Sequence, residues 1–185
     1  MFTTRKHQVL LGFFAALLLI PTTYADVLVV LEGIDGESTV KGFPGAPIEA
    51  ENFDWGLSRP GADTGYTATR ISGAPSIQAL RFSHSFDKAS PKLMEYCATG
   101  KTIPRAIVAV QKTGRDGQSL NYFVIELKNV IVTAVQLGGT DQSGLIVENV
   151  SLTFGEYKVK YTQSDATGKS MGTVETSYNI ATQKM

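Results

Sequence analysis

Residues 105–129, RAIVAVQKTGRDGQSLNYFVIELKN, hold the pattern that decides the fold. Two runs rich in Val, Ile, Tyr and Phe, residues 105–112 and 119–129, flank a short polar stretch at 113–117 that contains glycine. Branched and aromatic residues favour strands, and a short glycine-containing connection between two such runs predicts a β-hairpin. The second run alternates, so we expect one of its faces to lie on an apolar core.

Most of the remaining chain also has the composition of β-strands. Beyond the hairpin, we expect strands at 27–32, 48–58, 76–86, 129–139, 147–163 and 173–181. Within the fifth of these the large residues change parity, because Leu152 and Phe154 are even-numbered whereas Tyr157 and Val159 are odd-numbered. A one-residue shift moves every later side chain to the opposite face, so the pattern predicts a β-bulge at Gly155–Glu156.

One segment, DKASPKLMEYCATGK at 87–101, has helical rather than strand periodicity. Ser90 fits the N-cap and Pro91 the first helical position, where the missing N–H of proline has no cost. Gly100 is a natural left-handed stop. The residues that fall on one helical face are Leu93, Met94, Cys97 and Ala98. We expect a helix of two to three turns that packs on the β core through Leu93, Met94 and Cys97.

The N-terminus has the order of a secretory signal peptide. Arg5 and Lys6 precede an uncharged run at 9–20, and Ala25 supplies a small residue before the expected cleavage between Ala25 and Asp26. The run is shorter than the roughly 20 apolar residues of a membrane span. An uncleaved N-terminal anchor is the alternative. We expect residues 1–25 to be a signal peptide and 26–185 to form one domain, which is exported without stable membrane insertion after cleavage.

Charge and cysteine content exclude several classes. Loss of Arg5 and Lys6 leaves 15 Lys and Arg against 17 Asp and Glu, which is not the basic balance of a nucleic-acid binder. Cys97 is the only cysteine, so the fold does not rest on disulfides. Without a cysteine–histidine cluster we expect no metal site and no cofactor. Cys97 is expected to be a small buried hydrophobe, with a reactive or crosslinking thiol as the alternative.

Catalysis has little support in the sequence. His84 is the only histidine after the expected signal peptide and therefore the only histidine base for a nucleophile, and no GxSxG elbow accompanies it. It lies in an alternating strand, where a structural role is expected. Glu49 and Glu51 share one strand face, as is common on solvated sheets. We therefore expect no catalytic residues and no enzyme.

Four blocks of the chain resemble one known family. Residues 82–114 carry its central signature, which consists here of Asp87, Lys88, Ser90, Pro91, Leu93, Met94, Gly100 and Lys101. The blocks WGLSRPG at 55–61, ENVSLTFGEYKVKYTQ at 148–163 and SYNIATQ at 177–183 follow in register. Together they resemble the haemolysin-coregulated protein (Hcp) family, the tube subunits of type VI secretion, across essentially all of 27–183.

The resemblance implies a small antiparallel β-barrel of two sheets with one short flanking α-helix. It also implies a structural and transport role: hexameric rings that stack and carry effectors, with type VI spike and effector proteins as further partners. For the subunit contact we expect Leu57, Arg59, Tyr66 and Arg70, on or beside the Gly- and Pro-rich connection 59–75. The alternative is an exported monomer that reuses the fold as a binding module.

The signal peptide sets this chain apart from the family pattern, whose members are usually made without one. Either translation starts later than Met1 or the domain is exported. No methionine lies between Met1 and Met94, so a later start requires another codon. We therefore expect a secreted protein, with the periplasm as the alternative destination.

Overall fold

The computed structural model describes residues 25–59, 74–113, 119–140, 144–165 and 169–184. In this part of the chain the elements are β1 (Ala25–Leu31), β2 (Ile48–Asp54), β3 (Leu57–Ser58), β4 (Ser76–Ile77), β5 (Leu80–Ser85), α1 (Ser90–Thr99), β6 (Thr102–Thr113), β7 (Ser119–Thr140), β8 (Ile146–Thr153), β9 (Glu156–Ser164) and β10 (Ser170–Asn179).

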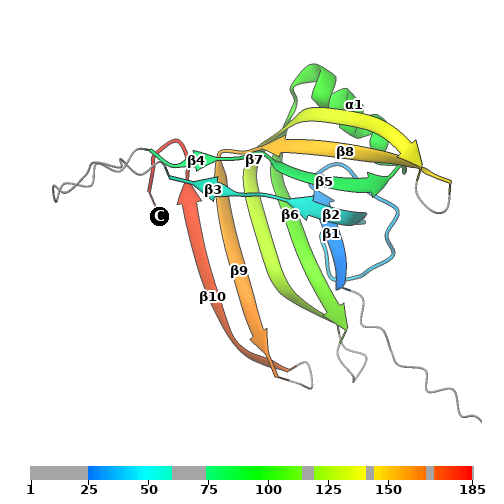
Figure 1. Cartoon of the computed structure of the whole chain (residues 1–185). Helices are drawn as coiled ribbons and strands as arrows, with labels where there is room; N and C mark the ends of the chain where they lie inside the picture. Colours follow the sequence, from blue (N-terminus) through cyan, green and yellow to red (C-terminus); the bar gives the residue numbers. More distant parts are fainter. Residues whose placement is uncertain (1–24, 60–73, 114–118, 141–143, 166–168, 185) are drawn as a thin grey trace, which may run out of the picture.

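Eight of these strands form one antiparallel sheet in the order β10-β9-β7-β6-β1-β2-β5-β8. An additional β7–β8 pairing joins the last strand back to the third, so six strands close into a barrel. β9 and β10 continue the sheet beyond the barrel, and α1 lies beside it (Figure 1). Strands β3 and β4 form a separate two-stranded ribbon. The expected fold class, an antiparallel β-barrel with one flanking helix, is confirmed.

The hairpin predicted at 105–129 is present, but its second strand is longer than expected. Thr113 pairs with Ser119, and the two predicted strands at 119–129 and 129–139 are a single strand, β7. One edge of β7 pairs with β9 over residues 123–128 and with β8 over 131–140. The change of partner occurs at Asn129, whose backbone is left-handed with φ 53°. Asparagine tolerates this conformation better than most residues.

The predicted bulge at Gly155–Glu156 is a strand boundary instead. β8 ends at Thr153 and β9 begins at Glu156, and the two strands occupy successive stretches of the same edge of β7. Gly155 donates its N–H to the carbonyl of Lys128 at 2.9 Å, directly beside the left-handed Asn129. The parity change in the sequence was therefore real, but its cause is that one partner strand ends and another begins.

Two other predicted strands are also divided. The segment 48–58 breaks at Trp55 and Gly56 into β2 and β3, and the segment 76–86 breaks between β4 and β5. The Trp55 indole N–H donates to the carbonyl of Gln78 at 3.1 Å across these two breaks. The ring of Trp55 packs edge-on against Tyr157 of β9, with ring centroids 4.9 Å apart. At these breaks Trp55 thus contacts both the β4–β5 connection and strand β9 of the extended part of the sheet.

The helix has the expected length and stop, but its cap and its buried face differ from the prediction. Ala89, not Ser90, is the N-cap; its N–H is accepted by the Asp87 carboxylate at 2.8 Å. The Ser90 hydroxyl accepts the N–H of Asp87 at 3.1 Å. Gly100 ends the helix with φ 65°.

Leu93 is fully buried as expected, and Tyr96 is buried beside it, whereas Ala98 is exposed. Met94 and Cys97 are half-buried, and Cys97 packs on the core from its edge. The helix is therefore rotated relative to the prediction, because the large Tyr96 ring buries more apolar surface than the small Ala98 side chain would.

Candidate assembly surface

The four residues expected at a subunit contact fall in two groups. Leu57 lies in β3 with 51 % of its surface exposed, and Arg59 follows the same strand and is exposed. Tyr66 and Arg70 lie outside the described residues. Of the four expected contact residues, the structure therefore locates Leu57 and Arg59. Because Trp55 contacts Tyr157, and Tyr157 contacts Tyr178 of β10 at 6.0 Å, β3 lies near the C-terminal end of β10.

Strand β10 is an open edge of the large sheet. Among the described strands it pairs with β9 alone, over the range from Ser170 to Asn179. Figure 1 shows β10 at the margin of the sheet, on the side away from the barrel. An edge strand presents unpaired N–H and C=O groups, and these are a template for pairing with another chain.

The apolar face of the sheet continues past the barrel to this edge. A row of directly paired residues crosses five strands from β1 to β10: Val27, Val110, Phe123, Tyr161 and Val174. Val110 is buried, but 49 % of Tyr161 and 74 % of Val174 are exposed. Met171, at the register shift near the start of β10, is exposed as well. The same alternation that builds the core therefore leaves an apolar strip uncovered on β9 and β10.

On the opposite face, charged side chains lie along β6, β7, β9 and β10. Three ion pairs cross neighbouring strands on this face: Arg105–Glu126 at 2.7 Å, Lys128–Glu156 at 2.8 Å and Lys158–Glu175 at 2.9 Å. The hydrogen bond from Lys128 to Glu156 raises the pKa of the lysine and lowers the pKa of the glutamate. On β9 and β10 one side of the sheet is therefore apolar and uncovered, and the other carries charged side chains of both signs.

His84 lies in the barrel rather than in a catalytic arrangement. Its Nε2 is 2.8 Å from Oε2 of Glu148 on the neighbouring strand β8, and neither side chain has exposed surface. Its Nδ1 is 3.9 Å from a carboxylate oxygen of Asp87. The histidine therefore links strands β5 and β8, which supports the structural role expected of it. Glu148 was not anticipated, because a charged residue in an alternating strand is ordinarily expected on the solvent side.

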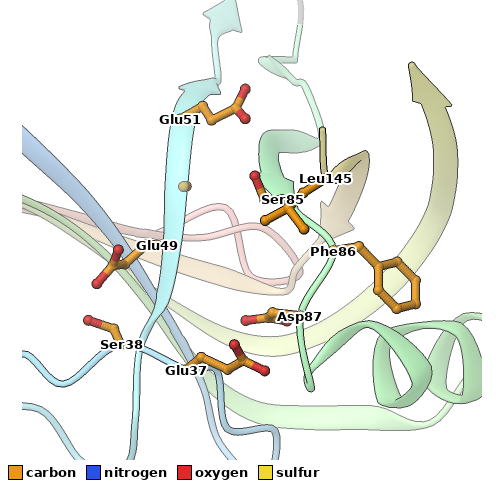
Figure 2. Close-up of a pocket in the computed structure, with 9 residues that line it drawn as sticks. Glu37, Ser38, Glu49, Glu51, Ser85, Phe86, Asp87 and Leu145 are labelled. Carbon is orange, nitrogen blue, oxygen red and sulfur yellow. The ribbon is translucent and has the colours of Figure 1, made fainter. Parts of the chain in front are cut away.

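A pocket of about 430 Å³ lies next to this end of the barrel. Figure 2 shows Glu49 and Glu51 on β2, with Ser85, Phe86 and Asp87 opposite them. Burial is the largest influence on Asp87 and raises the pKa of its carboxyl. Within the described residues no three His, Cys, Asp or Glu side chains converge in a way that would hold a metal ion.

The residues at the expected cleavage site are already part of the fold. Ala25 is the first residue of β1 and Asp26 the second, and they pair with Lys112 and Gln111 of β6. No helix in the described ranges has the length and apolar character needed to cross a membrane.

Comparison with known proteins agrees with this architecture. The family model described as "Type VI secretion system effector, Hcp" matches residues 29–161. Protein hcp1 of Pseudomonas aeruginosa is 37 % identical over 106 residues, which cover 57 % of this chain and 65 % of that protein. The aligned region thus spans slightly less than two thirds of the relative.

Solved structures match over nearly their whole length. Hcp1 from Salmonella typhimurium is 30 % identical with a TM-score of 0.67, covering 86 % of this chain and 97 % of that one. A structure titled only as a type six secretion system protein has a TM-score of 0.80 at 23 % identity, covering 87 % and 99 % of the two chains, and bears on the fold alone. With the family model matched over most of the domain and the barrel, helix and open sheet in place, the chain belongs to the Hcp family of type VI secretion system proteins.

Proposed function

We propose that this chain is a non-enzymatic subunit of hexameric rings, which stack and carry effector proteins. Membership of the Hcp family, a family of structural secretion proteins, supports this role. The observation that carries the proposal is the open β10 edge with its exposed apolar strip, described above. A ring requires two different complementary surfaces on each subunit, and a barrel closed on one side with an open sheet on the other offers such asymmetry.

The contact is proposed to include the β10 strip and Leu57 and Arg59 at β3. Tyr66 and Arg70, which lie outside the described residues, are proposed to take part as well. Burying Val174 and the exposed part of Tyr161 would remove apolar surface from water. Each Å² removed favours association by about 25 cal/mol. Backbone pairing along the β10 edge would add hydrogen bonds and fix the register of the contact. Without residues 1–25 the domain carries 15 Lys and Arg against 17 Asp and Glu, so long-range repulsion between like subunits is small.

Residues 1–25 are proposed to be a signal peptide that is removed between Ala25 and Asp26, so that the rings form outside the cytoplasm. The basic, apolar and small segments of the sequence support this. Mass spectrometry of the exported protein should find an N-terminus at Asp26. A mature protein that keeps residues 1–25 would contradict the proposal and favour an uncleaved anchor.

The assembly itself is tested on purified residues 26–185 by light scattering and negative-stain microscopy. We expect closed six-membered rings, and we expect Val174→Lys to convert them to monomers, because it places a charge in the apolar strip. The matched control is Thr173→Lys, one residue earlier on the same exposed edge but on the opposite face, which should retain rings. A monomeric unmodified domain would contradict the proposal and favour the exported binding module.

A further inference from the structure

The proposed cleavage bond lies inside the first strand of the barrel and not in a segment that precedes it. Ala25 and Asp26, on either side of the bond, are both in β1 and pair with Lys112 and Gln111 of β6. Figure 1 shows that β1 runs along β6, with β2 on its other side. No linker residue therefore separates the bond from the folded domain.

One residue beyond the bond, β1 is held from both sides. Val27 pairs with Val110 on β6 and with Ala50 on β2. The two following residues, Leu28 and Val29, have no exposed surface. Fraying can free the first two residues at small cost, but release of Val27 and beyond breaks two ladders and uncovers the core.

A peptidase binds the chain around the cleaved bond as an extended strand, using the backbone N–H and C=O groups of the substrate. In the folded domain both residues of the cleaved bond already lie in the ladder between β1 and β6. Cleavage of the folded precursor then depends on the fraction of molecules in which the start of β1 has opened.

We infer that folding of the domain closes the signal-peptide cleavage site, so that the signal peptide is removed before β1 joins the barrel. The inference rests on the signal peptide proposed above. In the reaction water adds across the Ala25–Asp26 peptide bond, leaving a carboxylate on Ala25 and a free amino group on Asp26. A precursor that folds before processing keeps residues 1–25, and the uncleaved bond stays within β1.

The test uses the folded precursor, residues 1–185, and a purified bacterial signal peptidase in detergent micelles. A matched variant carries about eight Gly and Ser residues inserted between Asp26 and Val27, which keeps the bond but moves it away from the strand. Circular dichroism and urea unfolding establish that both precursors are folded. We expect the spacer variant to be cleaved at least about tenfold faster than the native precursor, because cleavage of its bond does not require β1 to open.

A synthetic peptide of residues 15–32 separates the two ways of failing. If the peptide is not cleaved, the proposed signal-peptide site is wrong and the inference falls with it. If the peptide is cleaved and the native folded precursor is cleaved as fast as the spacer variant, the signal peptide stands and the inference is overturned. Cleavage of the peptide and the spacer variant, with a resistant native precursor, is the expected result.

Discussion

The barrel and the β9–β10 extension are built from the same sheet and share strand β7, yet they differ in what covers their apolar face. In the barrel, Ile125 and Leu127 of β7 point to a closed interior and have no exposed surface. On the extension, the same face carries Tyr161 and Val174, about half and three quarters exposed. In the barrel, closure of the sheet covers the apolar face. The β9–β10 extension is not closed, so its apolar face stays exposed.

The difference shows how one strand pattern can serve both stability and association. The barrel satisfies its own edges through the β7–β8 pairing, so its apolar side chains contribute to the folding of the single chain. The extension keeps one unpaired edge and an apolar strip, and a second molecule could pair with the edge and bury the strip. Substitutions in the barrel should therefore change unfolding, and those on the strip should change assembly.

The largest effect on stability should come from breaking the His84–Glu148 pair. We expect Glu148→Leu to lower the free energy of unfolding of residues 26–185 by about 3–5 kcal/mol, because it leaves a buried imidazole without its partner. Urea unfolding followed by circular dichroism measures this.

The matched control is Glu175→Leu, which removes the partner of Lys158 on the open sheet at a similar distance of 2.9 Å but in solvent. It should leave unfolding unchanged within error. The double variant His84→Leu/Glu148→Leu should cost less than Glu148→Leu alone. A single variant as stable as the unmodified domain would show that the buried pair does not hold the barrel.

A second contrast compares apolar truncations in the two regions. Leu152→Ala removes a fully buried side chain of the barrel and should lower the free energy of unfolding by about 2–5 kcal/mol. Val174→Ala removes exposed atoms and should change it by about 0.5 kcal/mol or less. Chemical denaturation of the monomer measures both values. If the two variants lose the same free energy of unfolding, the strip is already covered within the chain.

The junction between the regions can be tested at Asn129. Replacement by valine places a branched side chain in the left-handed conformation and should cost about 1–2 kcal/mol. Replacement by glycine, which adopts this conformation freely, is the control and should be close to neutral. If thermal melting finds the two variants alike, the left-handed turn is not what redirects β7 from β9 to β8.

A small effect is expected at Cys97. Because the thiol is half-buried on α1, Cys97→Ser should cost less than about 1 kcal/mol. The helix contributes to neither the open edge nor the apolar strip, so ring formation should be retained. Light scattering under non-reducing conditions checks this, and loss of rings would reveal a crosslinking role for the thiol.

Sequence patterns located most elements because alternation and helical periodicity are local properties. The hairpin at 105–129, the helix stop at Gly100 and a second hairpin strand with one face on the core were predictable in this way. The exchange of β9 for β8 along β7 was not, because it depends on partners distant in sequence. The parity change near Gly155 was the visible trace of that exchange, but a local bulge and a change of partner produce the same pattern.

The candidate surface was harder to anticipate than the fold. Val174 and Tyr161 have the alternation of ordinary core residues, and only the topology leaves them uncovered. Glu148 has the charge of a surface residue, and only closure of the barrel buries it against His84. The proposed contact residues Leu57 and Arg59 came from the family resemblance rather than from periodicity.

By itself, the sequence determined an all-β domain with one short helix, preceded by a segment with the order of a signal peptide, and its motif blocks indicated the Hcp family. These features depend on neighbours a few residues apart, whose side-chain types and spacing are visible in one dimension. The tertiary structure alone decided which strands close into a barrel, which edge stays open and which apolar side chains remain exposed. The reason is that burial is a property of the closed sheet as a whole, since identical alternation leads to a core or to a surface according to what lies opposite.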